Sequence, residues 1–274
     1  MVGSNISIKI RIFGDLSYKE VERNLGVAAD YTIDKGDVER FIYREEGIKK
    51  ISGKPAINRE WVRRFYFNGI DVNTEDVFAS FLSRLGAGTA YLKQLAERSP
   101  DDGDKMPGFD MIDMAVSLYV EIEGSNNISF STNSTALYDF ASLCNYSRIY
   151  YYCLAPSIDV DDDDDDIGDS EVEEFSISLG SRCNDVFNER ILQRGYLRDI
   201  SFLKLINNAA QLFTKNPWNK EMLCNPLCEM KLSACGCQGF SLDSKDVQVL
   251  CRAADVFSFD LRCISKQHDH TLLG

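Results

Sequence analysis

Four cysteines that lie close together in the sequence have the chemistry that is easiest to name. Cys224, Cys228, Cys235 and Cys237 fall within fourteen residues, and thiolates are ligands that structural zinc prefers. Zinc sites of this kind use pairs separated by two to four residues. Cys224 and Cys228 meet that spacing, whereas one residue separates Cys235 from Cys237 and places both on one face of a strand. We therefore expect buried thiols and no bound metal, with structural zinc as the alternative.

Catalysis by histidine is not expected. The chain has two histidines, His268 and His270, and both belong to a polar terminal segment. A Ser-His-Asp or Cys-His site needs its base in a dry pocket, which such a segment is poorly suited to provide. The sequence has no G-x-S-x-G motif, no P-loop and no strand-linked G-x-G-x-x-G turn. We expect a protein that is not an enzyme and uses no cofactor, although carboxylate-only catalysis stays open.

The acidic residues are concentrated in one segment. The chain has a net charge of −13, from 30 basic and 43 acidic residues. Eleven of these acids lie between Ile158 and Ser181 with no base among them, and without them the net charge is −2. A block of like charges repels itself and stays extended. Two roles stay open, a simple spacer or a contact with a basic partner, for the run of aspartates Asp161, Asp162, Asp163, Asp164, Asp165 and Asp166.

Three consecutive tyrosines precede the acidic segment. In a strand, Tyr150 and Tyr152 fall on one face and Tyr151 on the other. Aromatic rings with hydroxyl groups suit both the rim of a core and a partner-binding edge. We expect Tyr150 and Tyr152 to contact a partner, together with the aspartates.

A basic region lies near the start of the chain. Residues 35–64 carry nine bases and five acids and lead into Phe65, Tyr66 and Phe67. Such a surface can stack nucleic-acid bases, but a neutral remainder and a nearby acidic tract weaken attraction to phosphate. We expect a solvated basic face and no nucleic-acid partner.

Alternating apolar residues define most of the expected strands. Ile6, Ile8, Ile10 and Ile12 predict a first strand, and Ser17 with Glu20 predicts a capping box for a helix that ends at Gly26. Residues 30–60 resist assignment. Further strands are expected at 61–67, 114–122, 128–131, 148–153, 175–179, 229–237, 240–242 and 257–263. Helices are expected from Asn73 or Thr74, at 90–98, from 134, at 197–213 and around 247–254.

The two ends of this pattern resemble each other. Residues 128–141 can be laid beside residues 240–253, and each stretch leads into an aromatic-rich strand. We interpret this as a tandem repeat. The expected fold is α+β, with two tandem modules of antiparallel sheet packed with helices, the second module shorter. The modules occupy residues 1–156 and 175–265, joined by an acidic linker at 157–174 and followed by a tail at 266–274.

The first module resembles a known bacterial family. The stretches Ile8-Lys-Ile-Arg-Ile-Phe-Gly-Asp, Tyr18-Lys-Glu-Val-Glu-Arg-Asn-Leu-Gly and Lys35-Gly-Asp are similar to the opening of domain-of-unknown-function family 4279. The resemblance covers residues 5–155, with a degenerate second copy over the last forty or so residues. This sequence departs from the family by an insertion between Asp37 and Trp61. The resemblance implies an α+β sandwich and a bacterial setting, but no reaction.

These observations favour an interaction protein over an enzyme. The first fifteen residues lack the cationic start and apolar stretch of a secretion signal, and no apolar run approaches the roughly 18 residues that cross a bilayer. With an odd number of cysteines, nine, we expect reduced thiols in the cytoplasm and no membrane partner. The expected function is binding another protein, as an immunity protein against a toxin or nuclease, or as an inhibitor of a defence system. The alternative is an enzyme or small-ligand domain with carboxylates and tyrosine hydroxyls in a pocket between the modules.

Overall fold

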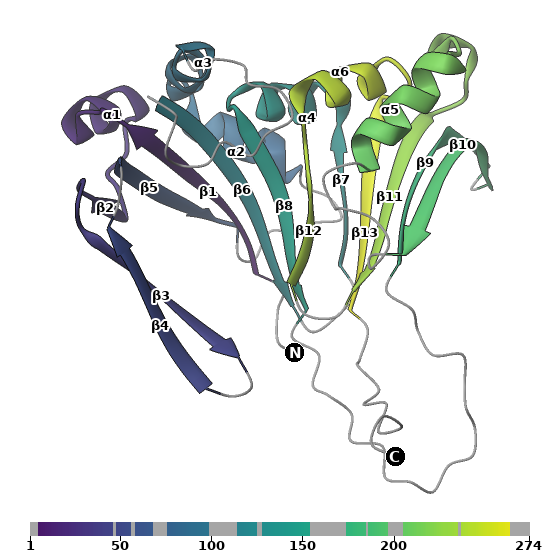
Figure 1. Cartoon of the computed structure of the whole chain (residues 1–274). Helices are drawn as coiled ribbons and strands as arrows, with labels where there is room; N and C mark the ends of the chain where they lie inside the picture. The colour runs from purple at the N-terminus through teal and green to yellow at the C-terminus, as the bar shows by residue number, and fades with distance from the viewer. Residues whose placement is uncertain are drawn as a thin grey trace, which may run out of the picture.

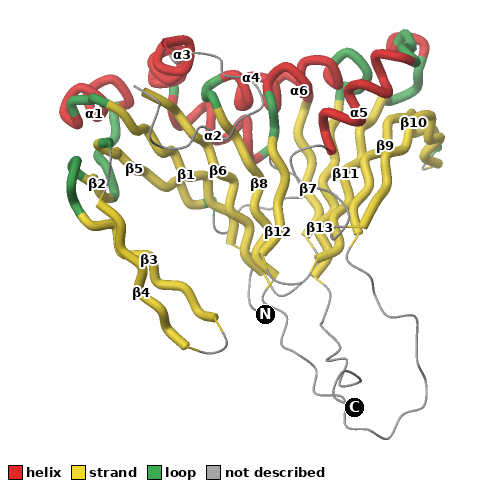
Figure 2. Tube along the Cα trace, viewed as in Figure 1, coloured by secondary structure: helices red, strands yellow, loops and turns green. Residues whose placement is uncertain are grey.

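The computed structural model describes residues 5–45, 48–55, 58–67, 76–98, 114–124, 128–153, 174–184, 186–196, 205–234 and 237–263. They form two sheets, a separate hairpin and a set of helices (Figure 1). The helices gather at one end of the molecule and the strands of both sheets converge toward the other (Figure 2). The expected α+β class, with two sheets packed with helices, is confirmed. The aspartates 161–166, Cys235 and both histidines lie outside the described residues.

The first sheet has the strand order β12-β8-β6-β1-β5-β2. Strand β1 spans Asn5–Gly14, and its alternating isoleucines are buried as the period of two predicts. Its neighbours β5 and β6 pair with it in antiparallel fashion. The other strands of the sheet are β2 (Tyr31–Ile33), β5 (Arg59–Tyr66), β6 (Met114–Gly124), β8 (Tyr146–Cys153) and β12 (Cys237–Ser241).

The second sheet has the strand order β10-β9-β11-β13-β7. Its core face is built from alternating apolar residues such as Phe257, Phe259 and Leu261. The strands are β7 (Ile128–Asn133), β9 (Glu174–Cys183), β10 (Val186–Tyr196), β11 (Pro226–Ala234) and β13 (Val256–Cys263).

Each sheet contains one parallel pair of strands. Strand β6 pairs with β8 in parallel, and β11 pairs with β13 in parallel. The other pairings in both sheets are antiparallel, as expected. In both parallel pairs a strand and a helix intervene along the chain, and a connection of that length can bring the next strand back in the same direction.

Each sheet also takes one strand from the other half of the chain. Strand β12 from the second half pairs with β8, while β7 from the first half pairs with β13. The order β8-β6-β1-β5 in the first sheet has its counterpart in β13-β11-β9-β10 in the second. The stretches 128–141 and 240–253 each contain a strand followed by a helix. In each stretch the strand is the one that pairs into the other sheet. The two stretches that resemble each other in sequence therefore occupy equivalent positions in the two sheets.

The two halves share one hydrophobic core. A single cluster of buried side chains extends from Ile6 in the first half to Leu261 in the second. At its centre the ring of Phe259 lies 4.7 Å from that of Phe130 and 5.9 Å from that of Phe240, both on exchanged strands. The described parts of the predicted modules are therefore joined in one core and do not form independent lobes.

The helices cover this core. The first helix, α1, ends at Gly26, which has a φ of 68° as a left-handed cap requires. Ser17 occupies the N-cap position, but its side chain makes no capping bond, so the expected capping box was wrong. Its carbonyl oxygen accepts from the amides of Glu20 and Val21 instead. The helices are α1 (Tyr18–Leu25), α2 (Val77–Leu85), α3 (Gly88–Arg98), α4 (Ser134–Ser142), α5 (Leu205–Lys215) and α6 (Ser244–Cys251), with a 3₁₀ turn at Lys220–Met222.

Helix α2 begins later than Asn73 or Thr74. Asp76 is its N-cap, and the carboxylate accepts from the amides of Phe78 and Ala79, each at 3.0 Å. A capping carboxylate satisfies amides that have no partner within the helix, so the cap fixes where the helix starts.

Three parts of the fold were not expected from the sequence, and the short strand β2 is one of them. Strands β3 (Val38–Glu45) and β4 (Ile48–Pro55) form a hairpin that is a sheet of its own and projects from the first sheet (Figure 1). It lies in the basic region, which the sequence left unassigned. Strand β10 was the third omission, and a bulge between Glu189 and Ile191 breaks its alternation.

Candidate protein-binding surface

Strand β8 carries a row of aromatic and arginine side chains on the face opposite the core. We call this row the ladder: Tyr146, Arg148, Tyr150 and Tyr152, all half-buried. The Arg148 guanidinium lies 4.4 Å from the centre of the Tyr146 ring, and Arg148 Nη1 donates to Tyr150 Oη at 3.1 Å. The rings of Tyr150 and Tyr152 stack with centroids 6.2 Å apart. The four side chains therefore form one continuous surface.

The core face of β8 explains why the ladder points outward. Ser147, Ile149 and Tyr151 alternate with the ladder residues and are buried. Ser147 Oγ donates to the carbonyl of Leu242 at 2.6 Å, and the Leu242 amide donates to the Ser147 carbonyl, which fastens β12 to β8. Burial raises the pKa of Tyr151 to about 12. The expected division of the three tyrosines between two faces is confirmed, because the period of two leaves no other arrangement once Ile149 enters the core.

Ion pairs continue this face across the sheet. Glu121 lies opposite Tyr150 in the pairing of β6 with β8. It forms ion pairs with Lys9 at 2.5 Å and with Arg64 at 2.8 Å. A bidentate pair follows, in which Arg11 donates to both carboxylate oxygens of Glu60 at 2.7 Å. Among these residues and Arg148, the cations outnumber the carboxylates by four to two.

The ladder has the composition of an interface. Tyrosine and arginine are enriched among the residues that contribute most to binding in protein complexes. Stacking holds these side chains in place, so less rotamer freedom is lost when a partner binds. The Nε–H of Arg148 has no acceptor in the part of the chain that the structure describes.

The acidic segment is tied to both sheets by the chain. Strand β8 ends at Cys153, eight residues before Asp161, and β9 begins at Glu174, eight residues after Asp166. Eight extended residues span at most about 28 Å.

Two of the four cysteines in the zinc hypothesis have side chains that the structure describes, Cys224 and Cys228. Cys228 is buried in the core face of β11, and Cys224 is exposed just before that strand. Cys235 lies outside the described residues, so the four-cysteine site stays a prediction. Across the described residues, no three metal-ligating side chains cluster.

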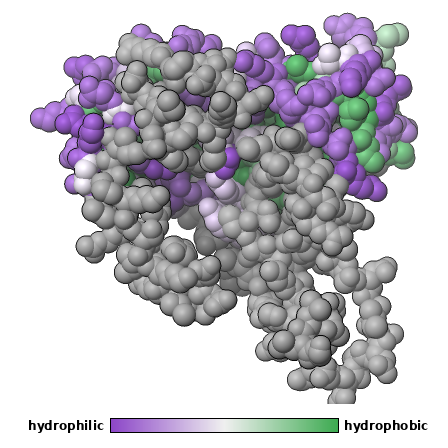
Figure 3. Space-filling model, viewed as in Figure 1, coloured by the Kyte–Doolittle hydropathy of each residue, from purple (hydrophilic) through white to green (hydrophobic). Residues whose placement is uncertain are grey.

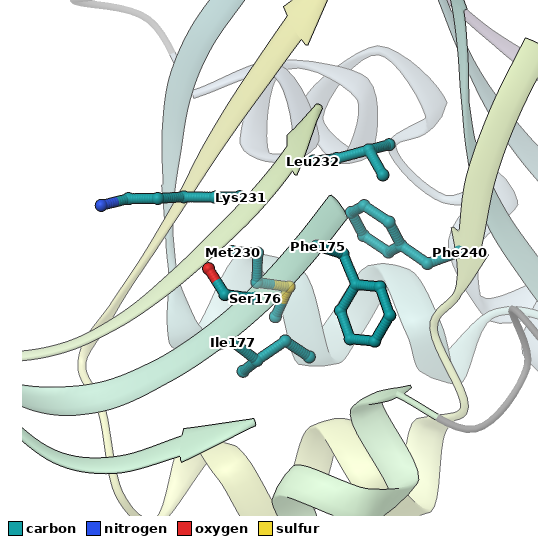
Figure 4. A pocket seen from close by; sticks show the side chains of 7 residues that line it. All are labelled: Phe175, Ser176, Ile177, Met230, Lys231, Leu232 and Phe240. Carbon is teal, nitrogen blue, oxygen red and sulfur yellow. The ribbon is translucent and has the colours of Figure 1, made fainter. Parts of the chain in front are cut away.

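A small apolar cavity lies between the two sheets. It lies between β9, β11 and β12 and has a volume of about 10 Å³. Figure 4 shows the rings of Phe175 and Phe240 beside Ile177 and Leu232 around it, with the Lys231 ammonium pointing away. No carboxylate lines this cavity, so it does not match the pocket required by the enzyme alternative.

A larger and more polar groove lies at the outer end of the second sheet. It has a volume of about 620 Å³, between Ser181 with residues 188–191 on one side and residues 216–218 on the other. Hydrophobic side chains also reach the surface near α5 and β10 (Figure 3). Val186 of β10 is 59% exposed.

Sequence reasoning missed Arg148 as part of the candidate surface. The signal was present, because Tyr146, Arg148, Tyr150 and Tyr152 alternate without interruption. A scan that compared residue types at every second position would have grouped them.

Comparisons with known proteins give no match. Scans against protein-family models, curated proteins and solved structures each find none. The resemblance to domain-of-unknown-function family 4279 therefore stays a prediction. Within the described residues, no helix combines the length and the apolar character that a membrane crossing demands.

Proposed function

We propose that this protein acts without catalysis, by binding another protein and covering its active surface. The observation that carries the proposal is the ladder on β8, where Arg148 joins Tyr146 to the stacked pair Tyr150 and Tyr152. The proposed partner is a basic toxin, nuclease or defence component, and the proposed setting is the bacterial cytoplasm. The protein would then be an immunity protein or an inhibitor.

The negative charge of the acidic segment supports a basic partner. Eleven carboxylates lie in one stretch of a chain that is otherwise close to neutral. A concentrated field of this kind steers an oppositely charged protein and raises its association rate. Because Asp161 follows the end of β8 by eight residues in the sequence, we propose that one partner meets both the ladder and the carboxylates.

The enzyme alternative has no comparable support. It needs converging acids in a pocket between the modules, and the described cavity between the two sheets has a volume of about 10 Å³ with apolar walls. Nucleic acid is also the weaker choice of partner, because the carboxylates would repel phosphate. We therefore propose protein binding alone.

The test is capture followed by inhibition. The full chain, immobilised, is used to capture proteins from a lysate of its host, and each captured protein is identified by mass spectrometry. We expect a basic protein whose own activity falls when the full chain is added. The double variant Tyr150→Ser/Tyr152→Ser should lose both the capture and the inhibition.

A matched control uses a tyrosine elsewhere on the same sheet. Tyr66 lies at the end of β5 and is 56% exposed, so Tyr66→Ser should keep both activities. Thermal unfolding of each variant must match that of the parent chain. Equal capture by the parent and the double variant would overturn the ladder as the contact surface, and a captured protein with unchanged activity would overturn inhibition.

A further inference from the structure

Two cysteines meet at the end of the second sheet, far apart in the sequence. Cys183 ends β9, and Cys224 lies two residues before β11. The last residues paired between these antiparallel strands are Ser181 and Pro226. Continuing that register places Arg182 opposite Asn225 and Cys183 opposite Cys224.

Hydrogen bonds extend the register to this point. The Arg182 amide donates to the Asn225 carbonyl at 3.2 Å, and Asn225 Nδ2 donates to the Arg182 carbonyl at 3.3 Å. Cys183 Sγ donates to the Cys224 carbonyl at 4.0 Å. Residues directly opposite each other on antiparallel strands have Cα atoms about 4.5–5.5 Å apart. A disulfide bridges Cα atoms about 4.4–6.8 Å apart, a range that includes this typical spacing.

The thiols also interact with each other. A hydrogen bond with Cys224, followed by burial, raises the pKa of Cys183. The two side chains are in contact, so an oxidant that reacts with one thiol finds the second beside it. When a second thiol is this close, a disulfide within the protein is favoured over a lasting mixed disulfide with the oxidant.

Exposure separates this pair from the other cysteines whose side chains the structure describes, Cys144, Cys228 and Cys251. Cys224 is exposed and Cys183 is half-buried, whereas Cys144 and Cys228 are buried. Cys251 is half-buried and its thiol donates to the Ser134 carbonyl at 3.3 Å. Reactivity of a thiol requires access as well as ionisation, and in the described part of the chain Cys183 and Cys224 combine access with a neighbouring thiol.

We infer that Cys183 and Cys224 form a reversible disulfide with a small disulfide oxidant such as oxidised glutathione. One thiol loses its proton and attacks a sulfur of glutathione disulfide, which forms a mixed disulfide and releases one glutathione. The second thiol then attacks the protein sulfur of that mixed disulfide and releases the second glutathione. Two thiols and one glutathione disulfide thus give one protein disulfide and two glutathione thiols, which take up the two protons.

The bond would fasten the two walls of the polar groove. Ser181 on one wall lies two residues before Cys183, and Trp218 on the other lies six residues before Cys224. The closed loop contains β10 and α5. Oxidation would therefore hold the β9–β10 hairpin against the segment that leads into β11, on a different sheet from the ladder.

Peptide mapping tests this directly. The full chain is equilibrated with mixtures of reduced and oxidised glutathione, its free thiols are blocked with iodoacetamide, and it is digested with trypsin without reduction. The peptide 183–190 should be linked to the peptide 221–231, and fragmentation should place the bond on Cys224 and not on Cys228. Reduction should release both peptides.

Two variants make the result decisive. Cys224→Ser should reduce the linked peptide at least tenfold, whereas Cys251→Ala should leave its yield within twofold of the parent. A persistent mixed disulfide on Cys224, a disulfide-linked dimer, or a dominant bond between other cysteines would overturn the inference. Loss of partner capture by the ladder variants has no bearing on this test, because the readout is the bond itself.

Discussion

Asp76 and Asn133, each the N-cap of a helix, are hydrogen-bonded to each other. Asn133 Nδ2 and its backbone amide both donate to Asp76 Oδ2 at 3.0 Å. Asp76 caps α2, while Asn133 Oδ1 accepts from the Ala136 amide at 2.8 Å and caps α4. Thr132, which is buried, donates to the same carboxylate at 2.8 Å. One carboxylate thus fixes two helix starts and the end of an exchanged strand.

Replacement of Asp76 by alanine should destabilise the protein by about 2–4 kcal/mol. The loss combines a helix cap, about 0.5–2 kcal/mol, with donors of Thr132 and Asn133 left without their acceptor. Urea unfolding of the full chain measures the change. Asp243→Ala is the control, because Asp243 caps only α6, through the amide of Lys245, and should cost about 1 kcal/mol. Equal losses in the two variants would contradict the double role.

Replacement of Arg148 by lysine should weaken capture of the partner about tenfold. Lysine keeps the charge but loses the planar group that lies over Tyr146 and donates to Tyr150. Binding of the purified captured protein, measured by calorimetry, gives the change. Arg262→Lys is the control, since Arg262 pairs with Asp260 on the other sheet and its side chain is 55% exposed. Unchanged affinity in Arg148→Lys would show that the stacking of Arg148 on Tyr146 does not contribute to binding.

Conversion of the aspartates 161–166 to asparagine should slow association with the partner by at least tenfold at low salt. The field that steers encounter would be reduced, so the rate should also lose much of its dependence on ionic strength. Stopped-flow measurements at 20 mM and 300 mM salt separate the two roles left open by the sequence. An unchanged rate would identify the segment as a spacer.

Cutting the chain between the halves should not separate them. A site for a specific protease inserted after residue 166 allows the cut, and the exchanged strands β7 and β12 should hold both fragments in one particle. We expect a single peak in size-exclusion chromatography of the cut protein, and two fragments only in denaturant. Separate peaks without denaturant would contradict the shared core.

Tyr151 should make the protein less stable in alkali. Its folded pKa of about 12 is above the unfolded value of 10, so the stabilisation is complete below pH 10 and is lost as the pH rises to 12. The loss for this group is about 2–3 kcal/mol. Urea unfolding at pH 9 and pH 11 should show a smaller decrease in Tyr151→Phe than in the parent chain. Parallel decreases would assign the effect to other groups.

The sequence predicted the strands whose faces alternate and could not predict their partners. Strand β1 was clear because Ile6, Ile8, Ile10 and Ile12 all enter the core. The pairing of β12 with β8 depends on contacts between residues about ninety positions apart, such as Phe240 opposite Ile149. Nothing in either stretch favours this pairing over one within its own half, since both supply apolar faces of the same period.

Strand β10 and the hairpin were missed for a different reason. At the edge of its sheet, β10 has mostly exposed side chains and a bulge, so its residues do not alternate between core and solvent. Hairpin strands β3 and β4 pair only with each other, and thus have no buried sheet neighbour to impose a pattern. Periodicity reports burial, and most described side chains of β10 are exposed.

The ladder and the cysteine pair differ in the same way in how far the sequence could predict them. The faces of Tyr150 and Tyr152 followed from the period of two, but the contact of Cys183 with Cys224 did not. Forty residues separate these two cysteines, and only the register of β9 with β11 brings them together. A pair of this kind becomes visible when strand pairing is known.

The exchanged strands have a consequence for how the two halves depend on each other. Each sheet contains one strand that the other half of the chain supplies. Because one polypeptide carries both halves, the strand that completes each sheet is always present in equal amount.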